Sequence, residues 1–233
     1  IVDDAPIACE DAVFSGLCAA RAVVSDEQKK AGVLVIDIGA GTTDFVLYYD
    51  GFVMAAGSIG VGGEHVTNDI SSGLQIPMAQ AELLKQEKGS AITNLMERDH
   101  NISVPASSQG FGAKIVRAIT LNTIINARMD ELFGLIKESI DRSCPNVPLG
   151  AGVLLTGGGS FLSGTRDLGQ KVFNAPCSQG KPFDVQGLST AKEGSLYACH
   201  IGAIRYASDM KTVEYKPSLG RRLLKVLWGG GRD

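Results

Sequence analysis

The residues best suited to chemistry lie together in one short polar stretch, and they are Asp37, Gly39, Gly41, Thr42, Thr43 and Asp44. Glycines let the backbone approach an anion closely and turn its N–H groups toward it. The threonine hydroxyls add donors, and the carboxylates suit a Mg²⁺ ion that keeps several of its waters. The stretch therefore predicts a site for a phosphate group and a hydrated metal ion. The alternative is an ordinary glycine-rich hairpin with polar side chains.

The elements on either side of this stretch are predicted to be β-strands. Residues 33–36 are apolar and mostly β-branched, the composition of a buried strand, and residues 45–49 form a second strand. Asp50-Gly51 is a strong hairpin signal before a third strand at residues 52–58. The polar stretch is then a tight turn between antiparallel strands. This arrangement excludes the Walker and Rossmann loops, which place the phosphate at the N-terminus of a helix.

A second glycine-rich turn lies further along the chain. Residues 152–155 predict a buried strand, residues 156–160 (Thr-Gly-Gly-Gly-Ser) a turn, and residues 163–173 an amphipathic helix. Taken alone, three glycines after a strand often mark only a sharp reversal from strand to helix.

Together, the two turns resemble the ATP-binding loops of the superfamily that includes actin, Hsp70 and the sugar kinases. The match rests on D-x-G-x-G-T-T-D between two strands and on T-G-G-G between a strand and a helix, in the superfamily's order. The resemblance implies an α/β fold, namely an actin/Hsp70-like ATPase lobe of the ribonuclease-H type. Such a lobe has a mixed sheet, flanking helices and an inserted α+β subdomain. The implied cofactors are ATP and Mg²⁺.

The same resemblance implies roles for individual residues. Asp37 would contact Mg²⁺ through water, and no residue receives a catalytic role. Glu82 and Lys85 share a face of the helix predicted over residues 77–89 and would touch the ribose. The alternative for this pair is a surface ion pair of little energetic value. The residues implied in ATP binding are Asp37, Gly39, Gly41, Thr42, Thr43, Gly62, Gly63, Glu82, Lys85, Gly157, Gly158, Gly159 and Ser160.

Hydrophobic periodicity predicts the remaining elements. Helices are expected over residues 9–24, 65–74, 77–89, 115–143, 163–173 and 195–208. The polar segment 90–112 is expected to contain one or two short strands, and residues 176–187 a loop. His65 is expected to be solvent-exposed or hydrogen-bonded and not a metal ligand or catalytic base, and His200 is expected to be structural and not a ligand.

Composition narrows the function class. The formal net charge of −3 gives no basic footprint, so nucleic-acid binding has no support. The five cysteines are scattered and include no C-x-x-C pair, as is typical of reduced cytosolic thiols. The sequence shows no signal peptide and no apolar run near the length of a membrane span.

A more specific resemblance is to the bacterial cell-division FtsA family. It rests on the segments IDIGAGTTDFVLYYDG, SIGVGGEHVTNDISSGL, AELLKQEKGSA, NTIINARMDEL, GVLLTGGGSFLSG and SLYACHIGAIRYAS. The patterns G-G-x-x-x-T-x-D-I and A-R-x-x-E-L are the specific ones, because Hsp70 and actin do not share them.

The family layout implies that this chain supplies the C-terminal lobe of two. Residues 31–63 and 150–210 would form subdomain 2A, and residues 64–149 the inserted subdomain 2B. Residues 1–30 resemble the last helix of the first lobe. No strand–Gly–strand copy precedes residue 33, so the first phosphate loop is expected to lie outside this sequence. Weak ATPase activity at most is therefore expected, and hydrolysis stays open.

Residues 211–233 are expected to form a linker and a short amphipathic membrane-binding helix. Leu219, Leu223, Leu227 and Trp228 would face the membrane, with basic side chains beside them. The alternatives are a disordered tail or a packing helix. FtsA proteins end in such a helix, which implies a location on the cytoplasmic face of the cell membrane at the division site.

The FtsA resemblance implies an actin-like ATP-binding protein that polymerises and tethers the tubulin-like division protein FtsZ to the membrane. Its implied partners are the FtsZ C-terminal tail, further copies of the chain and the membrane surface. Lys114, Arg117 and Arg128 are the candidates for binding the acidic tail, with solvated helix charge as the alternative. Two other functions stay open: a PilM-like assembly ATPase and a sugar-kinase-type phosphotransferase.

Overall fold

The computed structural model describes residues 9, 11–93, 99–106, 112–187 and 191–212. Its strands are β1 (Val33–Ile38), β2 (Thr43–Tyr49), β3 (Phe52–Ile59), β4 (Asn101–Val104), β5 (Lys114–Arg117), β6 (Val153–Thr156) and β7 (Cys177–Gln179). Its helices are α1 (Ser15–Val23), α2 (Asp26–Ala31), α3 (Gly63–Leu74), α4 (Met78–Lys88), α5 (Ala118–Ser143), the 3₁₀-helix η1 (Gly158–Phe161), α6 (Thr165–Phe173), α7 (Ala191–Leu196) and α8 (Ala198–Thr212).

One mixed sheet organises these elements, with the strands in the order β3-β2-β1-β6-β7. The predicted hairpins are confirmed, because β1, β2 and β3 pair antiparallel in sequence order. β1 also pairs in parallel with β6, and β6 with β7. Parallel neighbours point the same way, so the turns that follow β1 and β6 lie at the same edge of the sheet. The predicted α/β fold with a mixed sheet is confirmed.

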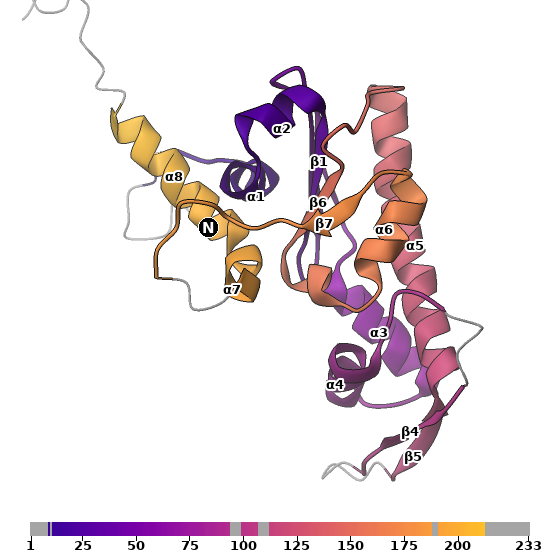
Figure 1. Ribbon diagram of the computed structural model, residues 1–233. Coiled ribbons are helices and arrows are strands. Elements are labelled where there is room, and N and C mark those ends of the chain that lie inside the picture. Colours follow the sequence, from indigo (N-terminus) through magenta and orange to yellow (C-terminus); the bar gives the residue numbers. More distant parts are fainter. Residues whose placement is uncertain (1–8, 10, 94–98, 107–111, 188–190, 213–233) are drawn as a thin grey trace, which may run out of the picture.

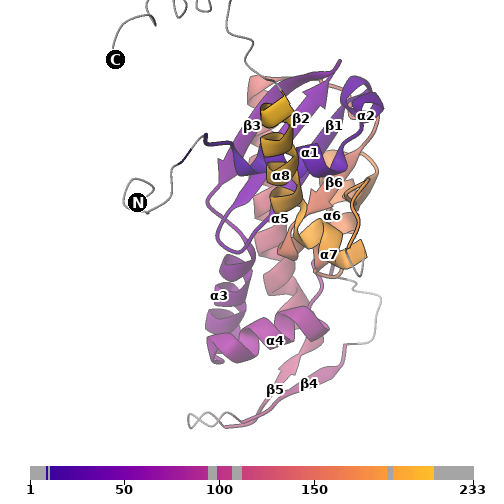
Figure 2. The same ribbon diagram turned by 90° about the vertical axis from the view of Figure 1, so that its left-hand side faces the viewer.

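Helices cover both faces of the sheet (Figures 1 and 2). α1 and α8 pack on one face, and α5 and α6 pack on the other. Successive residues of β1 point to opposite faces, so Val33 and Val35 contact the α1 side while Leu34 and Ile36 contact the α5 side. A strand buried on both faces requires the continuous apolar run seen in the sequence.

The crossover from β3 to β6 forms a smaller part of the molecule. α3, α4, β4 and β5 lie beyond the edge of the sheet, and α5 extends from them back along the sheet (Figure 1). One buried cluster continues between the two parts and includes Ile70, Leu121, Ile125 and Phe133. The long apolar stripe of α5 therefore supplies the core of the crossover as well as one cover of the sheet.

The structure corrects the predicted start of the longest helix. The pattern places that start at residue 115, but α5 begins at Ala118. Residues 114–117 form β5, which pairs antiparallel with β4. Ile115 and Val116 are β-branched and suit a paired strand better than a helix end. The expectation of short strands in the 90–112 segment is confirmed by β4.

Other boundaries also differ from the prediction. The helix expected over residues 9–24 begins at Ser15, and a separate helix, α2, follows it. Ser25 starts α2 through a capping box, in which its hydroxyl accepts from the Gln28 N–H at 3.3 Å and its N–H donates to the Gln28 side chain at 2.9 Å. The segment expected to be a loop includes β7, and the helix expected over residues 195–208 is divided into α7 and α8.

α1 and α8 approach each other closely at Gly202. A Cβ atom at this position would lie only 1.7 Å from the carbonyl oxygen of Cys18. Beside the crossing, Arg205 donates to the carbonyl oxygens of Arg21 at 3.2 Å and Ala22 at 3.1 Å. The small residues of α8 thus permit a helix contact that a larger side chain would prevent.

We predict that Gly202→Ala lowers the free energy of unfolding by about 2 kcal/mol or more, because the methyl group forces the two helices apart. Gly134→Ala is the matched control, since a Cβ on that exposed residue of α5 would meet no atom within 4 Å. The control should gain roughly 0.5–1 kcal/mol from helix propensity. Urea unfolding of the three proteins measures both effects, and equal stability of Gly202→Ala and the parent chain would contradict the close crossing.

Candidate functional site

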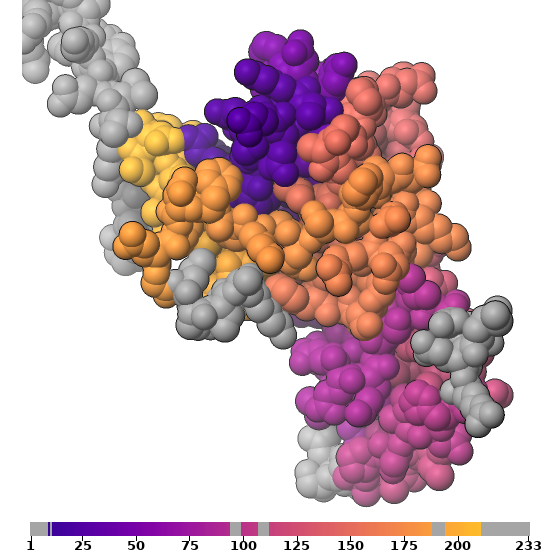
Figure 3. Space-filling model, viewed as in Figure 1, coloured from indigo at the N-terminus to yellow at the C-terminus, as the bar shows by residue number. Residues whose placement is uncertain are grey.

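A cleft of about 940 Å³ opens at the edge of the sheet where β1 and β6 end. Its walls come from β1 and the turn after it, the start of α3, one face of α4, η1 and the residues around the α7–α8 junction. In the space-filling view the surface is notched between α4 and the C-terminal helices (Figure 3). The volume is in the range of small-molecule sites, and clefts at the carboxyl ends of parallel strands are the usual place for them.

The structure brings most of the predicted site residues to this cleft. Those that line it are Asp37, Gly39, Gly63, Glu82, Lys85, Gly157, Gly158 and Gly159. Gly41 and Thr42 belong to the exposed turn beside it. Residues separated by more than a hundred positions in the chain thus meet because β1 and β6 are neighbours.

The turn after β1 presents unpaired backbone donors. The Gly39 N–H donates to the Thr42 carbonyl at 2.9 Å, which closes the turn. The N–H groups of Ala40, Gly41 and Thr42 have no hydrogen-bond partner in the described part of the chain. Successive free N–H groups in a turn are suited to an anion. A Cβ on Gly41 would meet no atom within 4 Å, so no contact of the chain itself excludes a side chain at this position.

α3 holds this turn from one side. The N–H groups of Gly63 and Glu64 donate to the carbonyl oxygens of Gly39 and Ala40, each at 2.9 Å. A Cβ on Gly62 would lie 2.5 Å from the Ala40 carbonyl oxygen, so the approach requires glycine. The N–H groups at the start of α3 are therefore hydrogen-bonded within the chain, and Gly62 and Gly63 position the turn.

His65 stabilises the start of α3. Its Nδ1 accepts from the Gly62 N–H at 3.1 Å. The expectation of a hydrogen-bonding histidine is confirmed.

Two of the predicted donors are occupied elsewhere. The Thr43 hydroxyl is buried and donates to the Val61 carbonyl at 2.8 Å. The Ser160 hydroxyl is buried, donates to the Gly157 carbonyl at 2.6 Å and accepts from Gln179 at 2.6 Å. These side chains stabilise the two turns from behind, and neither lines the cleft.

The second glycine-rich turn packs directly against the end of β1. Gly157 has a φ of +77°, and a Cβ there would lie 2.5 Å from the Ile38 carbonyl oxygen and 2.7 Å from Asp37 Oδ1. A Cβ on Gly159 would lie 2.3 Å from Ile38 Cγ2. Gly158, in contrast, has room, and the N–H groups of Gly158 and Gly159 have no partner among the residues described. The turn therefore lines the cleft with backbone that carries no side chains and has two unpaired N–H groups.

Asp37 is a half-buried carboxylate at the junction of the two turns. It accepts from the Thr156 hydroxyl at 2.9 Å and lies opposite Asp44 in the β1–β2 register. Burial raises the pKa of Asp37, and the Asp44 carboxylate raises it further, whereas the Thr156 hydrogen bond and His200 oppose the shift. Asp44 itself is bound by the Ser15 hydroxyl and does not line the cleft.

Over the ranges that the structure describes, no three His, Cys, Asp or Glu side chains gather closely enough to hold a metal ion.

Glu82 and Lys85 form an ion pair at 2.7 Å, and both line the cleft. Lys85 also donates to the Gly63 carbonyl at 2.9 Å and to the Thr67 hydroxyl at 2.8 Å. Burial raises the pKa of Glu82, but hydrogen bonds from Lys85, Thr67 and Gln86 outweigh burial and hold the pKa below its usual value. Because the Lys85 side chain is only 12% exposed, the pair is not the fully exposed surface ion pair of the alternative interpretation.

The cleft also contains residues that the sequence does not predict. His200 and Cys199 of α8 line it, and burial raises the pKa of the Cys199 thiol to about 11. The His200 ring packs edge-on against Tyr197 at 5.9 Å. Met129 adds an apolar surface from α5. Their positions follow from the packing of α8 and α5 around the sheet, and no local sequence signal identifies them.

A comparison with known protein families identifies the family of this chain. The family described as "Cell division protein FtsA" matches residues 34–202, which covers the sheet and the whole crossover. The chain belongs to the FtsA family.

Curated relatives agree with this assignment. The chain is 31% identical to cell division protein FtsA of Pseudomonas aeruginosa over 84% of its length and 47% of that protein. It is 33% identical to FtsA of Neisseria meningitidis over 84% of its length and 47% of that protein. With Rhizobium meliloti FtsA it shares 30% identity over 99% of its length and 52% of that protein. The chain thus spans about half the length of the curated relatives it matches.

Solved structures show the same fold at lower identity. MreB 5 of Spiroplasma citri bound to AMPPNP matches with a TM-score of 0.64 and 22% identity, over 85% of this chain and 59% of that one. A PilM–PilN type IV pilus biogenesis complex matches with a TM-score of 0.58 and 20% identity, over 82% of this chain and 50% of that one. The fold is that of the actin-like ATPases.

The three basic residues implied in partner binding by the FtsA resemblance are each engaged within the chain. Their contacts are Lys114 with the Leu74 carbonyl, Arg117 with Asp99, and Arg128 with Asp69 and Glu131. They lie on the crossover, at β5 and in the first half of α5. An acidic partner would therefore compete with carboxylates that already hold both arginines.

The predicted membrane-facing residues Leu219, Leu223, Leu227 and Trp228 lie outside the described residues. Within the described part, no helix combines the length and apolar character needed to cross a bilayer.

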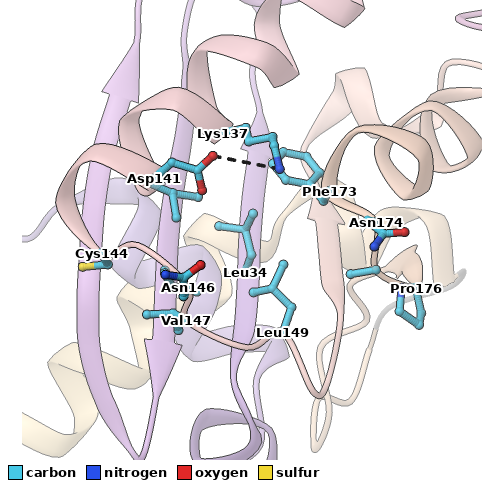
Figure 4. A pocket seen from close by; sticks show the side chains of 13 residues that line it. Leu34, Lys137, Asp141, Cys144, Asn146, Val147, Leu149, Phe173, Asn174 and Pro176 are labelled. Carbon is cyan, nitrogen blue, oxygen red and sulfur yellow. Dashed lines mark ion pairs between the residues drawn. The ribbon is translucent and has the colours of Figure 1, made fainter.

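A second, smaller cavity of about 280 Å³ lies on the α5 face of the sheet (Figure 4). Leu34 and Leu149 lie in it, and Lys137 and Asp141 form a loose ion pair at 4.0 Å. Leu34 is at the start of β1, so this cavity is at the opposite end of the strand from Asp37. None of the predicted site residues lines it.

We predict that Asp37→Asn raises the melting temperature at pH 7. The pKa of Asp37 is raised by folding, so its ionisation opposes the folded state at neutral pH and this penalty disappears as pH falls below the unfolded value. The amide keeps an acceptor for Thr156 without the charge. The gain should shrink between pH 7 and pH 4 in thermal unfolding scans, and exposed Asp130→Asn is the control. A variant less stable than the parent at pH 7 would contradict the assignment.

Proposed function

We propose that this chain forms the ATP-binding lobe of an actin-like cell-division protein and binds ATP with hydrated Mg²⁺ in the cleft at the ends of β1 and β6. One observation carries the proposal. Two glycine-rich turns converge on one cleft. The backbone N–H groups of Ala40, Gly41, Thr42 and Gly158 in these turns donate no hydrogen bond to any other described residue. Donors left free around an open cleft of sufficient volume fit a polyphosphate joined to a flat base.

Different residues of the cleft would bind different parts of ATP. The N–H groups of residues 40–42 would bind phosphate oxygens, and the open backbone of Gly158 and Gly159 would lie against the purine and ribose. Glu82 and Lys85 would contact the ribose. Asp37 would accept a hydrogen bond from a water on Mg²⁺, since its carboxylate is held in place by Thr156. The bound metal ion would offset the negative charge of the phosphates.

Membership of the FtsA family extends the proposal beyond nucleotide binding. The sheet segments 31–63 and 150–210 would be subdomain 2A, and residues 64–149 the inserted subdomain 2B. The chain would polymerise with further copies and bind the FtsZ C-terminal tail through Lys114, Arg117 and Arg128. Its C-terminal residues would attach the assembly to the cytoplasmic face of the membrane at the division site. The FtsA family match favours this function over a PilM-like or sugar-kinase role, because the likeness to PilM is one of fold.

Gly41→Ala tests the nucleotide site. No atom of the chain lies within 4 Å of the added methyl group, so the free energy of unfolding should change by less than about 0.5 kcal/mol. The methyl group would obstruct the phosphates, and we expect the Kd for AMPPNP with Mg²⁺ to rise about tenfold or more in calorimetric titrations.

Gly112→Ala is the matched control, because its added Cβ is equally unhindered but lies on the crossover away from the cleft. The control should bind as the parent does. An unchanged Kd in Gly41→Ala would contradict the phosphate role of the turn, and a parent chain that does not bind AMPPNP would contradict the proposed lobe function.

Co-sedimentation with anionic liposomes tests the proposed membrane attachment. The full chain should sediment with the vesicles, and a chain ending at Pro217 should remain in the supernatant because it lacks the apolar and basic residues of the tail. Neutral liposomes should retain less protein, since attraction to anionic lipid contributes to binding. Equal binding by the two chains, or none by either, would contradict this part of the proposal.

A further inference from the structure

The two sequence patterns that are specific to the FtsA resemblance meet in the structure. G-G-x-x-x-T-x-D-I covers residues 62–70 at the start of α3, and A-R-x-x-E-L covers residues 127–132 in α5. Arg128 of the second pattern binds Asp69 of the first with two hydrogen bonds, from Nε at 2.5 Å and from Nη2 at 3.1 Å. Both side chains are about one quarter exposed, so the pair is partly shielded from solvent. Bidentate contacts of this kind are among the strongest between side chains.

Arg128 has a second carboxylate within the chain. Its Nη1 donates to Glu131 Oε2 at 2.6 Å, one turn further along α5. The Glu131 side chain is 52% exposed, so this side of the guanidinium is open to solvent. A carboxylate arriving from outside would therefore reach Arg128 from the Glu131 side, replace Glu131 at Nη1 and compete with Asp69 for Nη2, the donor between the two carboxylates.

Thr67, two residues before Asp69, attaches α3 to α4. The threonine is only 3% exposed, and its hydroxyl accepts from Lys85 at 2.8 Å. The same hydroxyl lies 3.0 Å from the Gly63 carbonyl oxygen and also contacts Glu82. Lys85 donates to that carbonyl oxygen as well, at 2.9 Å. The first turn of α3 is thus fixed to the residues that line the cleft.

The same helix positions the turn after β1. Its first N–H groups, from Gly63 and Glu64, donate to the carbonyl oxygens of Gly39 and Ala40. α3 therefore carries three sets of contacts within two turns of helix: with the nucleotide-binding turn, with α4 through Thr67, and with α5 through Asp69. A rigid helix that is held at three places transmits a displacement at one of them to the others.

We infer that the Asp69–Arg128 pair is a positioning contact for the turn at residues 39–42, and that an acidic peptide bound at Arg128 loosens this turn by displacing Asp69. The displaced Asp69 carboxylate would lie beside the like charge of the peptide and move away from α5 with its helix. Gly63 and Glu64 would then lose their fixed distance from the turn. The consequence for ATP rests on the proposed nucleotide site, whereas the link between Arg128 and the turn does not.

The coupling is reciprocal, because two ligands that bias one equilibrium change each other's affinity by the same factor. A ligand that orders the turn would hold α3 against α5 and favour Asp69 at Arg128, so it would weaken the acidic peptide by the same factor. Partner binding and nucleotide binding would then oppose each other through one helix.

Amide hydrogen exchange of the full chain, measured by NMR without nucleotide, tests the link directly. We expect Arg128→Gln and Asp69→Asn to speed exchange of the Gly63 and Glu64 amides by at least about threefold, because the contact that holds α3 is lost. The amide of Ile36, within β1, should exchange as in the parent chain, which shows that the effect is local.

Arg142→Gln is the matched control on the same helix. It breaks an exposed ion pair with Glu138 at the far end of α5, at 2.6 Å in the parent chain, and should leave Gly63 and Glu64 unchanged. Arg128→Lys keeps the charge but loses the bidentate geometry, and it should give an intermediate rate. Exchange in Asp69→Asn and Arg128→Gln that matches the Arg142→Gln control would overturn the positioning role.

A synthetic peptide of alternating Glu and Gly tests the second half of the inference. It should shift the Arg128 Nε resonance and speed exchange of the Gly63 and Glu64 amides in the parent chain but not in Arg128→Gln. A Lys-Gly peptide should do neither. A Glu-Gly peptide that leaves the Arg128 resonance unchanged, or that shifts it with no change at Gly63 and Glu64, would overturn the displacement. Both experiments exclude nucleotide, so their failure is distinct from failure of the proposed ATP site.

Discussion

The parallel pairing of β1 with β6 is the constraint on which the candidate site depends. It sets Asp37 beside Thr156 and brings the turn at residues 39–42 to the same sheet edge as the turn at residues 157–159. The pairing tolerates no side chain where the second turn crosses β1, since a Cβ on Gly157 or Gly159 would lie within 2.5 Å of Ile38. The apolar run of β1, buried on both faces, holds that geometry in place.

The hydrogen-bond donors around the cleft are of two kinds: some are paired within the chain and position the site, and others are free to bind a ligand. The N–H groups at the start of α3 and the hydroxyls of Thr43 and Ser160 are paired within the chain. The N–H groups at the tip of the turn after β1 are not. The carbonyl oxygens of this turn hold its shape before a ligand binds, while its N–H groups stay free. Preorganisation of this kind lowers the entropic cost of binding.

The crossover between β3 and β6 connects the cleft to a separate surface. α3 contacts the turn through Gly63 and Glu64 and contacts α5 through Asp69, and α5 follows β5, where Arg117 is exposed. The ion pair of Arg128 lies between these two ends of the connection, and the ion pair of Arg117 lies at the β5 end. The same side chains that stabilise the crossover are therefore those that an acidic partner would meet first.

The sequence alone determined the two turns, the antiparallel strands around the first of them and the face shared by Glu82 and Lys85. These features depend on local periodicity and on hairpin and glycine signals, which neighbouring residues specify, whereas the mixed α/β fold was implied by the resemblance of the two turns to a known superfamily. Tertiary structure alone decided which donors are free. It buried the hydroxyls of Thr43 and Ser160, placed His200 on the cleft wall, and made residues 115–117 part of a strand paired with β4 where the sequence predicted helix. Such outcomes depend on partners distant in the chain, because burial and hydrogen bonding are properties of the packed molecule and not of any one segment.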